Sequence, residues 1–382
     1  MMEKVFLIVI SSAVILCAAY FVLIASYCMA WVRTKPPKFI NTDTVFVSVI
    51  IAARNEEDAI LNCLNALAKQ SYPSDKFEVI VVDDASTDTT KQLILEHSKK
   101  YPNVKLLDGG SGKKDALKKG IEVAQGELIV TTDADCASGE LWLSSIVSFY
   151  KETDAKMIIG PVCFQNEKSL FEKMQSLEFM ALISCGGASL FYDKAIMCNG
   201  ANLAYPKKVF EELKGFDGID EKASGDDILL MYKIKERYPQ GLKFLKSEEA
   251  VVYTAAKKDL KSFIDQRKRW ASKGFRSLNR ETKVVSLLIY CFNFMLVFLP
   301  LAAAVCLRNS AFYHIFMEIC LILMGIKCFI DFLLLFLSAS FFKKKKLLIY
   351  FLPEQIIYII YVVLIGLIGT LGKYEWKGRQ LN

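Results

Sequence analysis

Two long stretches without a charged residue bracket this sequence, and they set the first limit on its fold. Val5–Trp31 and Val284–Cys306 each exceed the ~20 apolar residues that a helix needs to cross a bilayer. The first stretch is too long for the apolar core of a signal peptide, and no small-residue cleavage site follows it. We therefore expect residues 1–33 to form an uncleaved N-terminal transmembrane anchor.

A second membrane region is predicted for residues 284–382, where Val284–Cys306, Phe312–Ser340 and Leu347–Gly372 read as about three helices. The charged residues within the last two segments should face protein, because charge inside a bilayer is costly. Lys327 and Asp331 are four residues apart and can pair on one helix face. Three spans would place the basic tail outside, although its charge favours the inside. Either one segment is re-entrant or interfacial, or the tail departs from the rule.

The net charge of +7 is concentrated beside the apolar segments. The clusters lie at residues 33–38, at residues 257–280 and at residues 343–346. This placement predicts a cytoplasmic face and anionic membrane lipid as a partner, and it argues against nucleic acid. A further region is predicted at residues 257–281. Within it, Asp259–Leu278 carries basic and apolar side chains at helical spacing, which predicts an amphipathic helix on the membrane surface.

The cysteines and histidines carry little metal-binding signal. The eleven cysteines include no C-x-x-C pair, and most lie in apolar runs, so they read as small hydrophobic residues in a reducing compartment. Only two histidines are present, which argues against a histidine-based metal site.

Residues 40–256 have the pattern of an α/β domain, because short apolar runs alternate with helical patterns. The expected strands are Val45–Ile51, Val79–Val82, Val104–Leu107 and Leu128–Thr132, with further strands at Lys156–Val162 and Val251–Thr254. This alternation predicts a mainly parallel sheet with right-handed crossovers. Acidic residues follow three of the strands, and they would share the edge at which such sheets bind ligands: Glu56, Asp83, Asp84, Asp133 and Asp135.

Three local patterns each have a functional and a purely structural interpretation. Asp133-Ala134-Asp135 suits a hard cation such as Mg²⁺ or Mn²⁺, which shares its coordination with phosphate oxygens, although a solvated acidic turn has the same pattern. Lys113 follows a glycine-rich stretch that is not a P-loop, so it is either part of a flexible surface loop or a cation near phosphate. Asp226 and Asp227 either cap a helix or supply a general base.

Seven motifs occur in a fixed order between Val45 and Trp270, and together they resemble one family. The chain looks like a membrane-anchored family 2 glycosyltransferase with a GT-A fold, related to cellulose, chitin and hyaluronan synthases. The fold implied is a Rossmann-like α/β domain with flanking transmembrane helices. The matching segments are Val47–Glu57, Val82–Asp88, Gly112-Lys113 with Ala116-Leu117, Asp133–Asp135, Gly200–Asn202, Gly225–Asp227 and Gln266–Trp270.

The resemblance implies a role for each motif. Ala53 and Glu56 would line the nucleotide pocket, and Asp83 or Asp84 would hold the base, usually uracil. Lys113 would lie near the nucleotide. Asp133 would lie near ribose or diphosphate, and Asp135 would bind Mg²⁺ or Mn²⁺. Asp227 would be the base that activates the acceptor hydroxyl, although spacing does not separate it from Asp226. In the Q-x-x-R-W motif of Gln266, Arg269 and Trp270, arginine would approach the diphosphate and tryptophan the acceptor sugar.

These roles predict an inverting, metal-dependent transferase. It would move a sugar from a nucleotide-sugar, with UDP the expected nucleotide, to a glycan or lipid-linked acceptor at the cytoplasmic membrane face. The alternatives are a processive polysaccharide synthase and a non-catalytic membrane scaffold that binds a nucleotide-sugar. About three C-terminal spans are few for a secretion pore, so polymer export would require a homo-oligomer or a separate export partner.

Overall fold

A computed structural model describes residues 2–38, 44–110, 112–218, 225–275, 279–306, 312–368, 374–376 and 379–381. Their contacts divide the chain into two units. Unit 1 comprises Met1–Arg33, Lys168–Ala188 and Lys257–Tyr374, and unit 2 comprises Thr34–Glu167, Ser189–Ala256 and Glu375–Asn382. The four-part division expected from the sequence stays a prediction.

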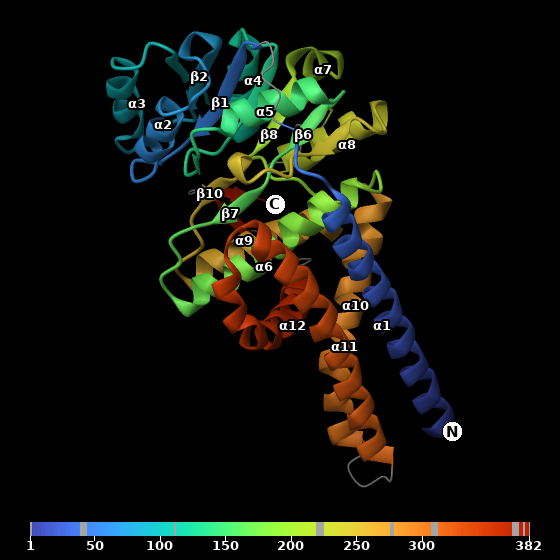
Figure 1. Ribbon diagram of the computed structural model, residues 1–382. Coiled ribbons are helices and arrows are strands. Elements are labelled where there is room, and N and C mark those ends of the chain that lie inside the picture. The colour runs from blue at the N-terminus through green and yellow to red at the C-terminus, as the bar shows by residue number, and fades with distance from the viewer. Residues whose placement is uncertain are drawn as a thin grey trace. The chain divides into compact units, whose positions relative to one another are not determined.

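Unit 2 is built on a seven-stranded sheet with the order β3-β2-β1-β4-β8-β6-β9 (Figure 1). The strands β3, β2, β1 and β4 pair with one another in parallel, which confirms the mainly parallel sheet. Strand β8 runs antiparallel to both β4 and β6. A second sheet has the order β5-β10-β7. The strands are β1 (Val47–Ala53), β2 (Phe77–Asp83), β3 (Val104–Asp108), β4 (Leu128–Thr131), β5 (Ala137–Ser138), β6 (Met157–Ile159), β7 (Val162–Phe164), β8 (Leu203–Pro206), β9 (Leu242–Phe244) and β10 (Val252–Thr254).

Helices cover this sheet, and its central strands are therefore apolar at nearly every position. Every residue of β2 is buried, and β1 has a single half-buried position. A Cβ at Gly120 would lie 2.7 Å from Ile50 Cγ2, so glycine lets its helix approach the sheet closely. The helices of unit 2 are α2 (Ile60–Ala68), α3 (Thr90–Ser98), α4 (Lys113–Val123), α5 (Trp142–Glu152), α7 (Lys207–Glu212) and α8 (Asp226–Arg237), with short η1 (Ser74–Lys76) and η2 (Glu248–Ala250).

The later strands of unit 2 differ from the expectation. The single strand expected at Lys156–Val162 is divided into β6 and β7 by Gly160 and Pro161. A Cβ at Gly160 would lie 2.3 Å from the Asn202 amide, and Pro161 has no N–H to donate to a ladder. The strands β8 and β9 were not expected at all, because each contains only a few residues and carries no clear alternation.

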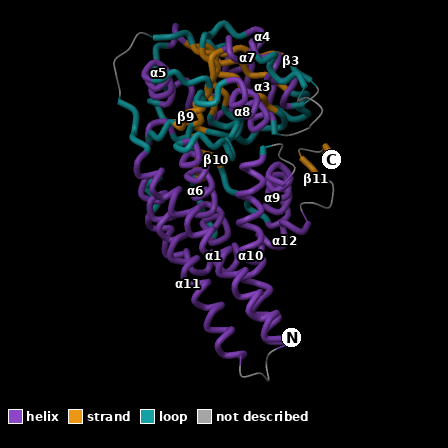
Figure 2. Tube along the Cα trace, turned by 90° about the vertical axis from the view of Figure 1, so that its right-hand side faces the viewer, coloured by secondary structure: helices purple, strands orange, loops and turns teal. Residues whose placement is uncertain are grey.

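Unit 1 contains α1 (Met2–Arg33), α10 (Arg280–Cys306) and α11 (Phe312–Phe341), which pack side by side (Figures 1 and 2). The predicted apolar segments are confirmed as helices, except that residues 369–372 of the last segment lie outside the described part of the chain. Four are long and apolar enough to cross a membrane, namely Leu7–Arg33, Arg280–Val305, Tyr313–Phe341 and Lys345–Leu367. The last of these consists of η3 (Lys345–Tyr350) followed by α12 (Phe351–Ile368).

A buried polar cluster joins three of these helices. Lys327 Nζ lies 2.6 Å from Asp331 Oδ2 and 2.6 Å from Gln355 Oε1, and the Tyr20 hydroxyl donates to Asp331 Oδ1 at 2.6 Å. The predicted pairing of Lys327 with Asp331 is therefore confirmed. The expectation that every charge in these segments faces protein is wrong for Glu318, which is exposed. It lies within two turns of the start of α11, where a long side chain can reach a polar region.

Two further helices of unit 1 come from outside the apolar segments. They are α6 (Leu170–Leu190) and α9 (Leu260–Phe275), and α9 packs against α10 and α12. Figures 1 and 2 show α6, α9 and α12 beside one another. The amphipathic helix predicted at Asp259–Leu278 is confirmed as far as Phe275, while residues 276–278 lie outside the described part of the chain. Its place on a membrane surface stays a prediction.

A buried carboxylate on β2 is a structural feature without a sequence motif. Glu78 Oε1 accepts hydrogen bonds from Ser48 Oγ and the Gln125 N–H, each at 2.7 Å, and Lys105 Nζ donates to Oε2 at 2.7 Å. Burial alone would raise the pKa of Glu78. The hydrogen bonds from Lys105, Gln125 and Ser48 outweigh that effect and hold the pKa below its ordinary value.

We expect Glu78→Gln to lower the free energy of unfolding at pH 7 by about 1–3 kcal/mol, because its buried donors lose a charged acceptor. A depressed pKa contributes stability above the unfolded value of about 4.3 and loses it as pH falls through the folded value. The difference between wild type and variant should therefore shrink from about pH 5 downward. Denaturant unfolding in detergent at several pH values measures this. Glu122→Gln, at an exposed carboxylate, is the control.

Candidate active site

Three parallel strands end together and bring the predicted acidic residues to one edge of the sheet. β1 lies between β2 and β4, and the register pairs Ala53 with Asp83 and Ile50 with Thr131. The turns that follow these strands carry Glu56, Asp84, Asp133 and Asp135. The predicted sharing of this edge is confirmed.

The turns after β1 and β2 are tied to each other and hold unusual backbone angles. Asn55 and Ala85 have φ values of 50° and 55°, a region that costs energy for residues other than glycine. The Asn55 N–H donates to Ser86 Oγ at 3.1 Å, and the Thr87 N–H donates to Asn55 Oδ1 at 2.9 Å. Next to them, the Glu56 N–H donates to Thr90 Oγ1 at 2.7 Å. The two turns therefore form one fixed wall of the site.

The two carboxylates of the Asp83-Asp84 pair have different surroundings. Asp83 Oδ2 accepts from the Ser86 N–H at 3.2 Å, while Asp83 Oδ1 is buried and has no hydrogen-bond partner among the described residues. Asp84 Oδ1 accepts from the Gly112 N–H at 2.9 Å, and the Asp84 N–H donates to the buried Ala53 carbonyl at 2.8 Å. Because a buried acceptor is costly to leave unpaired, Asp83 Oδ1 is suited to receive a ligand N–H.

The glycine-rich stretch before Lys113 is fixed against this wall. A Cβ at Gly109 would lie 2.6 Å from Val82 Cγ1, and the Gly109 N–H donates to the Asp83 carbonyl at 2.8 Å. Gly112 has a φ of 126°, which favours glycine. Ser111 lies outside the described residues. Gly109 and Gly112 are therefore both hydrogen-bonded to the Asp83-Asp84 segment, next to the start of α4.

Lys113 is held at the start of α4 by Asp133, with 2.5 Å between its Nζ and Asp133 Oδ1. Burial alone would lower the pKa of Lys113. The charges of Asp133, Asp226 and Asp227 outweigh it and raise that pKa above the ordinary lysine value. The side chain therefore remains a cation throughout the neutral range.

A pocket at this edge gathers the cation with three of the predicted carboxylates. Threonine and aromatic side chains also line it, and the sequence did not identify them because no motif marks them. The lining residues are Lys113, Leu117, Thr131, Thr132, Asp133, Gly200, Leu203, Tyr205, Phe216, Asp226, Asp227 and Leu230.

Asp227 is oriented by backbone groups. Its Oδ2 accepts from the Gly200 N–H at 3.2 Å, and its Oδ1 accepts from the Ile228 N–H at 2.9 Å. Thr131 Oγ1 in turn donates to the Gly200 carbonyl at 3.0 Å. Asp227 is half-buried whereas Asp226 is buried, so the more accessible carboxylate is Asp227.

The segment that orients Asp227 is itself fixed by Asn202. The Asn202 amide nitrogen donates to the Pro161 and Ala250 carbonyls, each at 2.8 Å, and its oxygen accepts from Trp142 Nε1 at 3.0 Å. Both N–H donors and one of the two oxygen lone pairs of this buried amide are therefore directed at protein. The Gly200–Asn202 motif thus has a structural reason as well as a place beside the pocket.

Asp133, Asp135 and Cys136 form a group that could hold a metal ion, with ligand atoms all within 4.8 Å of one another. Burial raises the pKa of the Cys136 thiol well above its ordinary value, and its Sγ lies 3.6 Å from Asp135 Oδ1. The carboxylate oxygens therefore fit a hard cation such as Mg²⁺ or Mn²⁺. The exposed Asp135 is the first candidate, because one oxygen of Asp133 already faces Lys113.

The Q-x-x-R-W residues lie on α9, in unit 1. Gln266 Oε1 accepts from Arg267 at 2.6 Å, and the Trp270 ring stacks on Phe179 with 5.7 Å between centroids. Arg269 is half-exposed. Arg267 had no role in the predicted site, because the motif leaves its position undefined. The sequence counted it among the basic residues of the membrane-surface helix, and that expectation is wrong for Arg267, because the structure buries it beside Glu178.

Part of the chain matches the model of a known family. Residues 48–214 match the model of glycosyl transferase family 2. The chain contains a family 2 glycosyltransferase domain. The match begins within β1 and ends beyond α7, so it includes all of the sheet edge with Asp83, Asp133 and Asp135.

Relatives and a solved structure agree with this domain. The glycosyltransferase AglE of Haloferax volcanii is 40% identical over 121 residues, which are 31% of this chain and 40% of the relative. The poly-β-1,6-N-acetyl-D-glucosamine synthase of Staphylococcus epidermidis is 26% identical over 256 residues, 65% of this chain and 60% of the relative. The chain thus matches less than two thirds of the length of either relative.

The fold is also that of a solved glycosyltransferase. The mannosyltransferase PcManGT from Pyrobaculum calidifontis, solved in complex with GDP-Man and Mn²⁺, superposes with a TM-score of 0.62. The match is 22% identical and covers 94% of this chain and 99% of PcManGT. With the observed strand order, it confirms the predicted GT-A fold for the glycosyltransferase domain.

We expect Lys113→Met to tighten Mn²⁺ binding roughly fivefold, because removing the ammonium frees Asp133 and changes the local charge by about 1 kcal/mol of binding energy. Mn²⁺ titration followed by electron paramagnetic resonance measures the change. Lys118→Met removes a cation from the same helix outside the pocket and should leave the affinity unaltered. Weaker binding in Lys113→Met would instead show that Lys113 holds Asp133 in a ligating position.

Proposed function

We propose that this protein is an inverting, metal-dependent glycosyltransferase. It moves a sugar from a nucleotide-sugar to a hydroxyl of a glycan or lipid-linked acceptor at the cytoplasmic membrane face. The observation that carries the proposal is the pocket that joins Lys113 and Asp133 to Asp226 and Asp227 at the sheet edge. It lies in a family 2 domain, whose relatives include enzymes named for sugar transfer and sugar polymerisation.

Asp83 is proposed to recognise the base. Its buried, unmatched Oδ1 can accept the ring N–H of uracil, and this pairing leaves Asp84 in its contact with the Gly112 N–H. UDP-sugars are therefore the first donors to test. Guanine also carries a ring N–H, and PcManGT was solved with GDP-Man, so GDP-sugars are the second. Ala53 and Glu56 complete this wall.

Asp227 is proposed as the general base. It accepts the proton of the acceptor hydroxyl while the hydroxyl oxygen forms a bond to the anomeric carbon. The bond from that carbon to the diphosphate oxygen breaks, and its electron pair leaves with the nucleoside diphosphate. One such displacement inverts the configuration at the anomeric carbon. The Gly200 and Ile228 N–H groups support this role, because they hold the carboxylate in one orientation.

The leaving diphosphate requires positive charge nearby. Lys113, which stays protonated, supplies one charge at the pocket. Asp135, assisted by Asp133, would hold Mg²⁺ or Mn²⁺, and the bound cation would neutralise diphosphate oxygens. Arg269 of the Q-x-x-R-W motif is proposed to approach the same diphosphate, with Trp270 facing the acceptor sugar.

The membrane location and the acceptor are proposals of the same kind. Among the described residues, four helices have the length and composition of membrane spans. Basic clusters beside them favour a cytoplasmic catalytic domain near anionic lipid. The relative from Staphylococcus epidermidis is named as a polysaccharide synthase, which favours a processive reaction as the second candidate. That reaction would require a homo-oligomer or an export partner, and product length by mass spectrometry separates the two.

We expect Asp227→Asn and Asp135→Asn each to reduce nucleotide release by roughly 10²–10⁴ with Mn²⁺ present, because one removes the base and the other the metal ligand. The assay uses UDP-glucose, UDP-N-acetylglucosamine and GDP-mannose as donors, with a melting curve to confirm folding. Asp217→Asn, at an exposed acid paired with Lys118, should keep wild-type turnover. Unchanged turnover in Asp227→Asn would contradict the assignment.

We expect Asp83→Asn to raise KM for a UDP-sugar about tenfold with little change in kcat. The substitution weakens a charge-assisted hydrogen bond to the base, which is made equally in ground and transition states. Steady-state kinetics of nucleotide release measures both constants. If Asp84→Asn raises KM and Asp83→Asn does not, the base contact belongs to Asp84.

A further inference from the structure

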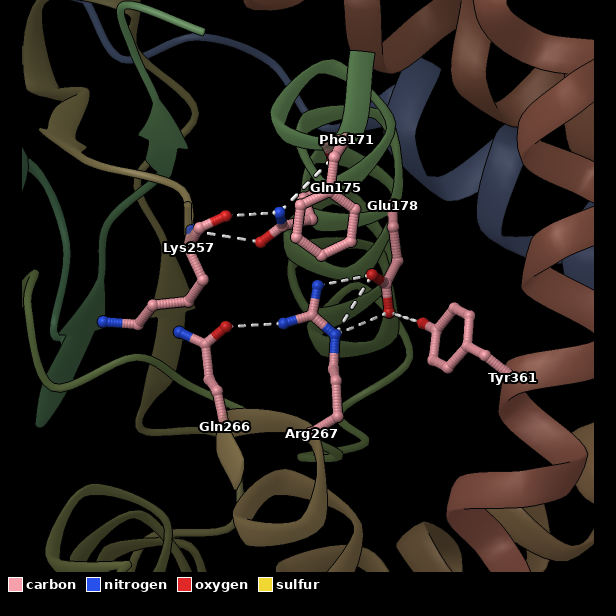
Figure 3. Close-up of polar contacts among 7 residues, drawn as sticks. All are labelled: Phe171, Gln175, Glu178, Lys257, Gln266, Arg267 and Tyr361. Atoms are coloured by element: carbon pink, nitrogen blue, oxygen red, sulfur yellow. Dashed lines mark hydrogen bonds and ion pairs between the residues drawn. The ribbon is translucent and has the colours of Figure 1, made fainter. Parts of the chain in front are cut away.

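Arg267 lies on α9 between two residues of the Q-x-x-R-W motif, and it is almost completely buried, with 3% of its side chain exposed. A buried guanidinium is unusual, because removing a charge from water is costly unless it is paired and hydrogen-bonded. Figure 3 shows it surrounded by Glu178 on one side and Gln266 on the other. Its contacts therefore need an explanation of their own.

One side of the guanidinium is anchored to α6 and α12. Arg267 Nε lies 3.2 and 3.1 Å from the two oxygens of Glu178, and a terminal nitrogen lies 2.5 Å from Oε2 (Figure 3). The Tyr361 hydroxyl of α12 donates to the same carboxylate. Three helices thus meet at one ion pair.

A second link joins the start of α9 to α6 near this pair. The Gln175 amide nitrogen donates to the Lys257 carbonyl at 2.8 Å, and its oxygen accepts from the Lys257 N–H at 3.1 Å (Figure 3). The first turns of α9 are therefore held against α6 both before the helix begins and at Arg267. This leaves the backbone that carries Gln266 little freedom.

The other terminal nitrogen of Arg267 fixes the orientation of Gln266. It donates to Gln266 Oε1 at 2.6 Å. Because a guanidinium only donates hydrogen bonds, the amide must turn its oxygen to Arg267 and its NH₂ group away. Figure 3 shows the Gln266 nitrogen on the side opposite Arg267. An amide held in this way presents a donor, which is the group that an anionic diphosphate oxygen accepts.

The guanidinium also lies over aromatic rings. Its central carbon lies 4.4 Å from the centroid of Trp270 and 4.4 Å from the centroid of Phe263. Phe179 of α6 stacks on Trp270, with an interplanar angle of 23°. The orientation of the Trp270 ring is therefore set by Arg267 together with Phe179.

We propose that Arg267 is a positioning residue for sugar transfer, which holds the Gln266 amide and the Trp270 ring in the orientations that the reaction uses. This inference rests on the proposed function, in which these two residues contact donor and acceptor. Lysine is not equivalent to arginine here, because a single ammonium lacks the fixed planar fork with which Arg267 donates to both oxygens of Glu178 and to Gln266 while its central carbon lies over the Trp270 ring. A buried ion pair adds little net stability by itself, so stability alone does not account for it.

The test compares single and double variants in the full chain in detergent. Nucleotide release is measured with Mn²⁺ and the fastest donor among UDP-glucose, UDP-N-acetylglucosamine and GDP-mannose. We expect Arg267→Lys to lower kcat/KM roughly 10–100-fold, as misplacement of substrate-contacting groups does. Gln266→Ala should lower it similarly, and the double variant should be no worse than the more affected single variant, because Arg267 acts partly through Gln266. Lys261→Met, which removes an exposed cation from α9, should have no effect.

A second variant covers the case in which Arg267→Lys does not fold. Gln266→Glu keeps the shape and gains an ion pair with Arg267, so its melting temperature should be unchanged or higher. It loses the NH₂ donor, and kcat/KM should fall as in Gln266→Ala. Loss of turnover without loss of thermal stability is a result that a purely structural role of the cluster would not give.

The outcomes separate the two proposals. The positioning role would be overturned if the loss of kcat/KM in the double variant equalled the product of the losses in Arg267→Lys and Gln266→Ala. Wild-type turnover in Gln266→Glu would overturn it as well. Either result leaves the transferase proposal in place. Wild-type turnover in Asp227→Asn would overturn the transferase proposal and the positioning role with it.

Discussion

Repulsion among carboxylates at one sheet edge is the constraint on which unit 2 depends. Parallel pairing of β2, β1 and β4 forces Asp83, Asp84, Asp133 and Asp135 to the same side. The fold offsets that charge with the Lys113 ammonium beside Asp133 and with the Gly112 N–H, which donates to Asp84. The remaining carboxylate charge at this edge favours binding of a cation, and the neighbouring Lys113 ammonium favours binding of an anion. A metal–diphosphate group carries both signs and suits both.

Unit 1 meets the opposite problem, because polar groups lie among apolar helices. There Lys327 is paired with Asp331 and also donates to Gln355. Arg267 and Glu178 follow the same rule on α9 and α6. The difference lies in what surrounds each pair. The first joins helices, whereas the second also contacts Gln266 and Trp270, two residues that we propose contact substrate.

The predictable part of the fold is the part governed by local pattern. β1, β2 and β4 are buried on both faces, so their runs of apolar residues identify them, and the acidic residues at their ends follow from the same pattern. β8 and β9 are short and lack such runs, and they depend on long-range pairing that the local sequence does not record. Glu318 was placed wrongly because composition does not tell which face of a helix meets protein.

The residues of the candidate site also divide into those that the sequence identified and those that it did not. Motifs identified Lys113, Asp133 and Asp227, which line one pocket in the structure. They did not identify Thr131 or Tyr205, because side chains that shape a pocket carry no fixed spacing. Arg267 and Glu178 are 89 residues apart, and only the packed helices bring them together. Their pairing could not be inferred from either segment alone.

The central claim is that one sheet edge binds both a nucleotide and a divalent cation. A structure of the full chain determined with UDP and Mn²⁺ tests it most directly. The account predicts uracil against Asp83, the diphosphate between Lys113 and the cation, and Mn²⁺ coordinated by Asp135. Nucleotide bound away from the ends of β1, β2 and β4, or Mn²⁺ bound without Asp135, would contradict it.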